Sequence, residues 1–318
     1  MLSNIFHLGL RLAEKQIPIY VHPEKCLHSR HKLSSCSKCQ DICPAQAVQL
    51  EEYLNVELSC QGCNLCIAVC PTEALESKKK SLPAFYSEVR RKSEENERLI
   101  FHCNHVIDHF HSGISLSCLG ELDDITILLA IANGVKNFYF LSEMCATCDW
   151  RKGNEVFHRR FNKWKETWQR LNWEYINNSE EMKLLNQEKQ LVNTDKINRR
   201  EFFNMIAKET RTSIKESVQL KKDVSPWNNG ELASLQSLRL DIYQNWIKPK
   251  IDIQTLQTIK RLDVNENCLG CTICGKVCPT HAIAIDDILN KPVCNVEQCI
   301  DCNLCVDVCY RKAISIKD

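Results

Sequence analysis

Cysteine recurs at a fixed spacing in four segments of the chain. Each segment reads CxxCxxxC and is followed, after three further residues, by alanine and an aliphatic residue; the segments begin at Cys36, Cys63, Cys271 and Cys302. Three segments have a further cysteine three positions upstream, at Cys60, Cys268 and Cys299. In a tight loop, the full CxxCxxCxxxC spacing points three thiolates at one inorganic core while the fourth reaches a neighbouring core. This pattern is specific for [4Fe-4S] clusters.

The residues that follow each motif favour the same interpretation. Proline fixes the backbone where the chain leaves the site, at Pro44, Pro71 and Pro279. We expect the alanine and the aliphatic residue to begin a short helix or turn that packs beneath the cluster and excludes water. The alternative is zinc held by four cysteines, but such sites normally have two CxxC pairs separated by a longer stretch.

Both ends of the chain, residues 20–76 and 262–316, resemble the bacterial-type two-cluster ferredoxin. The resemblance implies that the fourth cysteine of each motif ligates the other cluster of its pair. At the N-terminal end it implies one cluster on Cys43, Cys60, Cys63 and Cys66, and a second on Cys26, Cys36, Cys39 and Cys70. At the C-terminal end it implies one cluster on Cys268, Cys271, Cys274 and Cys309, and another on Cys278, Cys299, Cys302 and Cys305. The predicted cofactors are therefore four [4Fe-4S] clusters.

The chain departs from the ferredoxin pattern in two places. Tyr310 stands where proline is expected, and nine residues, LHSRHKLSS, separate Cys26 from Cys36 in place of two. We therefore expect an enlarged loop in which Cys26 is still a ligand; His28 or His31 in this loop is the alternative. Cys294 belongs to none of the four ligand sets and is interpreted as a small buried or free thiol.

Another pair of cysteines, Cys145 and Cys148, lies far from these motifs in the segment MCATCDWRKGN. The surrounding pattern predicts strands and helices in alternation: strands at 99–103, 114–118 and 137–142, and helices at 121–134 and after Asn154, where an apolar stripe runs from Phe157 to Tyr175. This order indicates a small α/β domain with a parallel sheet, which collects ligands at the carboxyl ends of its strands.

Cys103, Cys118 and Cys145 fall at or just after such strand ends, and Cys148 follows one short turn later. Four thiols should therefore converge on one edge of the sheet. A thioredoxin-like dithiol fits this arrangement less well, because it needs only two cysteines at a helix N-terminus.

Residues 98–172 resemble the delta subunit of methyl-viologen-reducing hydrogenase, which works with heterodisulfide reductase and carries a [2Fe-2S] cluster. The likeness is carried by Cys103, by Cys118 with Gly120, and by the CATC element with its following glycine and asparagine, Gly153 and Asn154. It implies a [2Fe-2S] cluster on Cys103, Cys118, Cys145 and Cys148. Val106 stands where the family often has another cysteine, and a four-cysteine zinc site or an unloaded domain are the alternatives.

The predicted fold class is α+β and multi-domain. Two ferredoxin-like dicluster domains, 1–80 and 263–318, flank a small α/β domain with a parallel sheet, 98–175, and a helical connector, 176–262. Residues 77–98 are polar and charged and are interpreted as a linker. The connector contains no cysteine and few core residues, so we expect it to dock on a partner.

The composition limits the possible locations and partners. With 44% hydrophobic and 25% charged residues the chain is an ordinary soluble protein, but 21 cysteines in 318 residues point to metal. The first residues show no secretory signal, so we expect a cytoplasmic protein with reduced thiols. The longest apolar run, 125–132, is too short to span a membrane. Metal-bound thiolates would make the protein negatively charged, which excludes a nucleic-acid partner.

The predicted sites are closed cages of cysteine, and the sequence offers no catalytic acid, activated nucleophile or nucleotide-binding glycine loop. The chain is therefore interpreted as a non-catalytic electron-transfer subunit of an oxidoreductase. Its expected protein partner is a hydrogenase, a formate-dehydrogenase-like enzyme or a heterodisulfide-reductase-like complex. The alternatives are an iron–sulfur redox or iron sensor that acts through a protein partner, and a zinc-stapled interaction scaffold.

Overall fold

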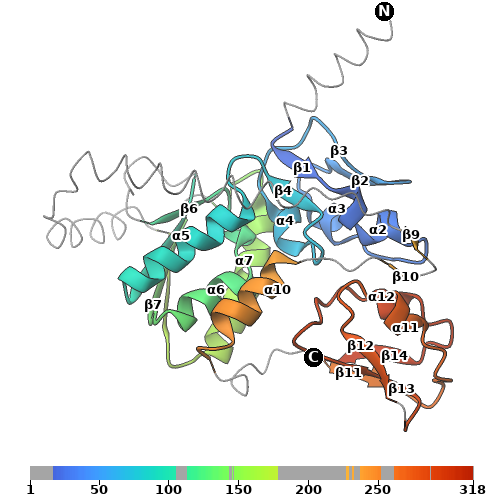
Figure 1. The fold of residues 1–318 in the computed structure, drawn as a ribbon. Coiled ribbons are helices and arrows are strands. Elements are labelled where there is room, and N and C mark those ends of the chain that lie inside the picture. The colour runs from blue at the N-terminus through green and yellow to red at the C-terminus, as the bar shows by residue number, and fades with distance from the viewer. Residues whose placement is uncertain are drawn as a thin grey trace, which may run out of the picture.

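The computed structural model of the protein describes residues 17–104, 113–142, 145, 147–177, 227–228, 231–232, 237–251, 261–286 and 288–317. Within these ranges the fold is mixed α/β, with short antiparallel strand pairs towards each end and a parallel sheet between them in sequence (Figure 1). All 21 cysteines lie in these ranges, and none forms a disulfide. None of the helices described is long and apolar enough to cross a membrane. Val106 and most of the predicted connector lie outside the described residues.

The N-terminal unit, residues 17–77, contains two antiparallel strand pairs, β1 with β4 and β2 with β3. Its elements are β1 (Ile19–Val21), η1 (Pro23–Lys25), α2 (Leu27–Arg30), α3 (Lys38–Ile42), β2 (Val48–Leu50), β3 (Leu54–Val56), α4 (Leu65–Val69) and β4 (Leu75–Ser77). Aliphatic side chains from the strands pack directly on cysteines in one small core. A core of this size supplies little stability alone.

The C-terminal unit, residues 261–317, repeats this plan with β11 paired to β14 and β12 paired to β13. Its elements are β11 (Arg261–Val264), α11 (Ile273–Lys276), β12 (Ile283–Asp286), β13 (Lys291–Cys294), α12 (Leu304–Asp307) and β14 (Ile314–Lys317). In both units the aliphatic residue after each cysteine motif begins a strand: Val48 in β2, Leu75 in β4, Ile283 in β12 and Ile314 in β14. The expectation that a short helix or turn begins here is therefore wrong, because the turn comes before the alanine and the aliphatic residue already pairs as a strand.

The middle of the chain forms a four-stranded sheet in the order β6-β5-β7-β8, and every pair is parallel, which confirms the predicted parallel sheet. Its elements are α5 (Leu82–Glu95), β5 (Arg98–Cys103), β6 (Ile114–Leu116), η2 (Leu119–Glu121), α6 (Asp124–Ala132), β7 (Asn137–Leu141), α7 (Arg151–Thr167) and β8 (Asn172–Ile176). Aromatic side chains of the strands and of α7 stack in the core, as Phe140 does against Phe157 with ring centroids 5.2 Å apart. We call this part, residues 82–176, the middle domain.

Two expectations for this region are wrong. The segment 77–98 contains a helix, α5, because Ser81 caps its first turn and Pro83 lies within that turn. Tyr86 and Val89 on its inner face are fully buried, and the many charges of the outer face hide this pattern in the sequence.

The apolar stripe that ends at Tyr175 is not one helix. The helix α7 ends at Thr167, and the last aromatic residues belong to the edge strand β8, whose burial alternates along the strand. Leu171 and Tyr175 are four residues apart, as on one face of a helix, but Leu171, Trp173 and Tyr175 also fit the two-residue period of a strand, and pairing with β7 decides between them.

Part of the predicted connector belongs to the folded core. The described elements are β9 (Trp227–Asn228), β10 (Glu231–Leu232), α10 (Leu238–Ile242) and η3 (Tyr243–Ile247), a single π-helical turn. Ile242 and Ile247 are buried against the middle domain, with 1% and 0% of their surface exposed. This stretch therefore contributes core residues, contrary to the expectation of few.

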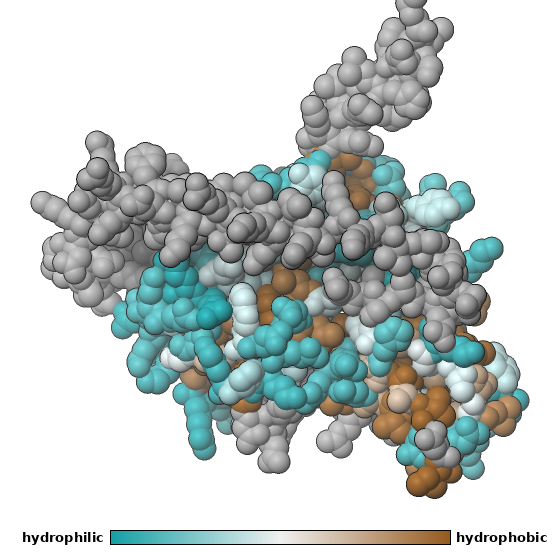
Figure 2. Space-filling view, in the orientation of Figure 1, coloured by the Kyte–Doolittle hydropathy of each residue, from teal (hydrophilic) through white to brown (hydrophobic). Residues whose placement is uncertain are grey.

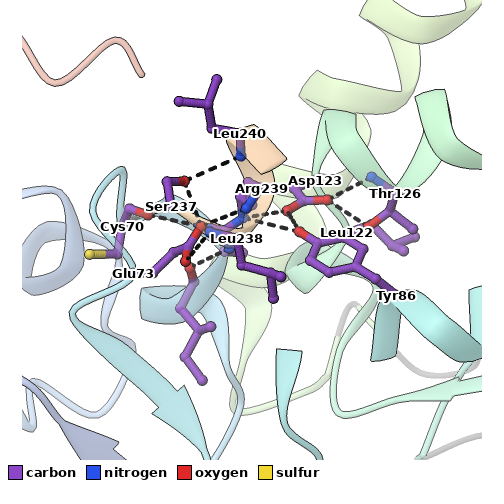
Figure 3. Close-up of polar contacts among 12 residues, drawn as sticks. Cys70, Glu73, Tyr86, Leu122, Asp123, Thr126, Ser237, Leu238, Arg239 and Leu240 are labelled. Carbon is purple, nitrogen blue, oxygen red and sulfur yellow. Dashed lines mark hydrogen bonds and ion pairs between the residues drawn. The ribbon is translucent and has the colours of Figure 1, made fainter. Parts of the chain in front are cut away.

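Arg239, in α10, joins the N-terminal unit to the middle domain (Figure 3). Its Nε donates to Asp123 Oδ2 at 2.8 Å and to the Tyr86 hydroxyl at 3.1 Å. Its terminal nitrogens donate to the carbonyls of Cys70 at 2.9 Å and Ile67 at 3.0 Å, at the end of α4. Burial alone would raise the pKa of Asp123, but the guanidinium and the neighbouring hydrogen-bond donors outweigh it and hold that pKa below its usual value. The pair is therefore charged, buried and hydrogen-bonded on both sides.

Replacement of Arg239 by alanine should destabilise the protein strongly, because it leaves the buried Asp123 carboxylate without its counter-charge. We expect the free energy of unfolding to fall by about 3–5 kcal/mol in anaerobic urea unfolding. The control is Arg91→Ala, which removes an exposed pair with Glu95 and should change the same quantity by less than about 1 kcal/mol. Equal effects of the two substitutions would contradict this role for Arg239.

Candidate metal centres

The cysteines predicted as ligands gather into five groups, which we name sites A to E in the order in which neighbouring groups contact one another. Site A consists of Cys103, Cys118, Cys145 and Cys148. Site B consists of Cys43, Cys60, Cys63 and Cys66, and site C of Cys26, Cys36, Cys39 and Cys70. Site D consists of Cys278, Cys299, Cys302 and Cys305, and site E of Cys268, Cys271, Cys274 and Cys309. The thiols are thus grouped as the sequence predicts, and occupation by clusters stays a prediction.

Site C includes Cys26 in spite of the enlarged loop. Burial, followed by the neighbouring thiols of Cys70, Cys26 and Cys36, raises the pKa of Cys39 to about 12. The two histidines of the loop have backbone partners: His28 Nε2 donates to the carbonyl of Glu51 at 2.9 Å, and His31 Nδ1 accepts from the amide of Leu33 at 3.2 Å. The structure therefore places the cysteine with the other three thiols.

Site B shares its core with site C, and its Cys66 lies within α4. Burial raises the pKa of Cys63 to about 11, and Cys43 and Cys60 add to the shift. Burial also raises the pKa of Cys66, with contributions from Cys63, Cys60, Cys39 and Cys43. The fourth cysteine of the first motif, Cys43, thus lies with the thiols of the second motif, which is the exchange expected for a two-cluster ferredoxin.

The alanine of each motif donates its backbone N–H to the sulfur of the fourth cysteine. The distances are 3.2 Å for Ala47 to Cys43, 3.3 Å for Ala74 to Cys70, 3.2 Å for Ala282 to Cys278 and 3.2 Å for Ala313 to Cys309. All four alanines are buried. Such bonds favour the thiolate form and shift the potential of a bound cluster. Each copy of the motif therefore stabilises its fourth thiolate in the same way.

Sites D and E occupy the C-terminal unit. Burial raises the pKa of Cys305 to about 12, with Cys302, Cys299, Cys278 and Cys274 as further causes. Site E is the more open of the two, because Cys271 is exposed. Tyr310, which replaces the expected proline next to this site, is 65% exposed.

Cys294 lines the same cavity as the four thiols of site D. A side-chain hydrogen bond with Cys299 is the first cause that raises its pKa, followed by burial and the nearby thiols. The interpretation of Cys294 as a small buried or free thiol did not include this position beside site D. It comes from β13, where Cys294 pairs with Ile283, and no cysteine spacing in the sequence signals this strand pairing.

Site A lines a cavity of about 390 Å³ at the carboxyl ends of β5, β6 and β7. Cys103 and Cys118 are buried, whereas Cys145 and Cys148 are half-buried. The side-chain oxygen of Asn154 faces no protein partner and is buried at the same cavity. A buried polar atom without a partner is costly, so this cavity is suited to a polar or inorganic ligand.

Two glycines make room for the Cys118 sulfur. A Cβ at Gly153, in the first turn of α7, would collide with that sulfur, and a Cβ at Gly120 would lie 2.5 Å from the carbonyl oxygen of Gly153. The N-terminus of α7 can therefore approach η2 only with glycine at both positions. Ser142, Tyr175 and Gln61 also border site A, and the sequence analysis missed all three.

The donor chemistry of the sites fits iron–sulfur clusters. Burial opposes ionisation of the thiols, and each neighbouring thiolate opposes it further, so four thiolates need a positive core among them. Amide N–H groups aimed at the sulfurs compensate part of this cost. In the part of the chain that the structure describes, no three histidine, cysteine or acidic side chains are close enough to hold a single metal ion. The sets of thiols are those that cluster binding requires.

Site A contacts site B, and site B contacts site C. Leu65, between two cysteines of site B, packs against Cys63 and Cys118. Cys63 contributes to the raised pKa of Cys118, after burial and the thiol of Cys103. Site B in turn meets site C, because Cys66 and Cys39 pack in the same cluster of buried side chains.

Sites C and D meet where α2 faces α11 and α12 across the two units (Figure 1). Leu27, 1% exposed, packs with Val277, Leu304 and Val308, and the same cluster contacts one cysteine of each site, Cys36 and Cys302. Hydrogen bonds between the two units lie beside this cluster. The amide and the hydroxyl of Ser35 donate to Asp307 at 2.8 and 2.7 Å. Lys38 donates to the carbonyl of Asp301 at 2.8 Å. Site D meets site E through Cys305 and Cys274.

The comparisons with known proteins give two family matches. Residues 34–81 match the LdpA Fe-S cluster-binding domain, and residues 260–310 match the 4Fe-4S dicluster domain. These ranges contain every cysteine of sites B to E except Cys26. The chain therefore contains iron–sulfur-binding domains of the ferredoxin-like kind, with an electron-transfer or redox role. No curated protein and no solved structure matches.

Five thiols line the cavity of site D, which allows a direct test of which of them are ligands. Cys299→Ser should lower the iron content by about four atoms per chain, because the motif assigns this thiolate to a [4Fe-4S] cluster. Cys294→Ser should leave iron unchanged. Iron and acid-labile sulfide are measured on anaerobically purified variants, and a loss with Cys294→Ser but not with Cys299→Ser would reverse the assignment.

Proposed function

We propose that the protein carries single electrons between a redox enzyme and another carrier, using [4Fe-4S] clusters at sites B to E and a [2Fe-2S] cluster at site A. The observation that supports this most is the continuous series of contacts from site A to site E. Clusters of this kind exchange one electron at a time. The chain itself holds the thiolates, keeps water away from them and fixes their order.

The side chains between neighbouring sites are suited to this role. Leu65 is 0% exposed between sites A and B, and Leu304 is 0% exposed between sites C and D. Apolar side chains at these places exclude water, so neighbouring sites are separated only by packed protein. A sensor or a scaffold would need the thiols but not such a series.

The resemblance of residues 98–172 to a hydrogenase delta subunit supports a hydrogenase, a formate-dehydrogenase-like enzyme or a heterodisulfide-reductase-like complex as the partner. The all-thiol sites favour a reducing compartment such as the cytoplasm. In this proposal the protein is an electron-transfer subunit, and the partner performs the catalysis.

Metal analysis tests the cluster content. Anaerobically purified protein should contain about 18 iron atoms per chain, with sulfide in proportion, because each cube binds four thiolates and the smaller cluster binds the remaining four. Reduction with dithionite should give paramagnetic signals of several interacting clusters. Zinc in place of iron, or a colourless protein, would exclude this function and favour the scaffold.

The middle domain has a separate test. The double substitution Cys145→Ser with Cys148→Ser should remove only the signal of the two-iron cluster and about two iron atoms per chain, since these thiols belong to site A alone. The spectra of the other sites serve as the internal control. An unchanged paramagnetic spectrum would refute a cluster at site A.

A further inference from the structure

One position of the cysteine motif contacts a different cysteine site in three of its four copies. It is the residue just before the second cysteine of each CxxCxxxC segment: Lys38, Leu65, Ile273 and Leu304. Leu65 of site B contacts Cys118 of site A. Leu304 of site D packs with Leu27 and Cys36 at site C, and Lys38 of site C reaches the loop of site D.

The same backbone turn presents this residue in the three full-length motifs. The preceding residue has a left-handed conformation in each, with φ of 63° at Asn64, 64° at Thr272 and 63° at Asn303. The following side chain is therefore directed in the same way relative to its own site. Leu65 and Leu304 are both 0% exposed because another site covers them.

Ile273 is the exception, and it is 39% exposed. Around it lie Leu269, 60% exposed, and Tyr310, 65% exposed, and all three line one small cavity with the cysteines of site E. Figure 2 shows apolar residues gathered over the C-terminal unit. Such an exposed apolar patch next to a reactive centre marks an interaction surface.

The rim of this patch is basic. Lys276 ends α11 two residues after Cys274, and Arg311 and Lys312 follow Tyr310; all three are exposed. Glu266 is also exposed on this unit, but the basic residues outnumber it. An apolar centre with a basic rim is complementary to an apolar surface with an acidic rim.

We propose that Ile273, with Leu269 and Tyr310, is the docking surface for a small, acidic, one-electron carrier protein whose own redox centre lies beneath an apolar surface. This inference rests on the proposed function. Inside the chain, another cysteine site covers each equivalent leucine, Leu65 and Leu304. The partner that fits the exposed Ile273 in the same way is therefore a redox site of a second protein. One electron leaves the reduced carrier and enters site E, or moves in the opposite direction, with no covalent bond formed or broken.

Binding of a defined probe tests this surface without any turnover. The probe is a purified, acidic [2Fe-2S] ferredoxin in its oxidised form, titrated into the iron-loaded full-length protein by calorimetry at low ionic strength. Ile273→Asp should weaken binding roughly tenfold, because it removes the central apolar contact and adds a charge that repels an acidic partner. The matched control is Tyr53→Asp, which places the same charge at another apolar side chain, 58% exposed on the N-terminal unit, and should leave the affinity unchanged.

The outcomes separate the two proposals. Equal affinity of the wild-type protein and the Ile273→Asp variant, or no binding of the probe to the wild type, overturns the docking surface. A wild-type protein without iron overturns the proposed function instead. If Ile273→Asp lowers the iron content, Lys276→Glu with Arg311→Glu is measured in its place: weaker binding with a smaller salt dependence supports the docking surface, and unchanged binding overturns it.

Discussion

The repulsion among buried thiolates is the constraint on which the rest of the structure depends. Burial and neighbouring thiols together raise the pKa of one cysteine at each of sites A to D, namely Cys118, Cys66, Cys39 and Cys305, so that the charged form of these thiols needs a positive core. Secondary structure in the terminal units is short, and cysteines form a substantial part of their small cores. We therefore expect folding and cluster binding to be coupled in these units, because a small core supplies little stability alone.

Two arginines connect that constraint to the middle domain. Arg160 of α7 donates to the carbonyls of Gly120 and, at 3.5 Å, Ala68, and Arg239 donates to those of Ile67 and Cys70. Positive charge is thus concentrated at the C-terminal end of α4, where the last carbonyls have no helical partners. This helix carries Cys66 and leads to Cys70, so the same two side chains hold ligands of sites B and C against the middle domain.

The sequence predicts which cysteines belong to each site but little about how the sites are arranged relative to one another. The spacing of the cysteines and the strand ends at Cys103 and Cys118 sufficed to group the thiols, because both are local or follow from parallel strand order. The helix α5 was hidden by its charged outer face, and the position of Cys294 depends on strand pairing. Ser35 and Asp307, which close the contact of the two units, are 272 positions apart. Nothing in a single sequence signals such a pair.

The repeated segment CNLC shows how similar motifs acquire different roles. Cys63–Cys66 and Cys302–Cys305 have identical sequences and the same left-handed asparagine, yet one leucine faces the middle domain and the other faces Leu27. The motif fixes the direction of the leucine side chain relative to its own site. The neighbouring domain or unit determines which residues that side chain contacts. In a chain with two such two-site units, the leucine of each buried motif therefore contacts a neighbouring site. At the outermost copy, Ile273 has the same backbone geometry and an exposed side chain, so the series ends at a surface.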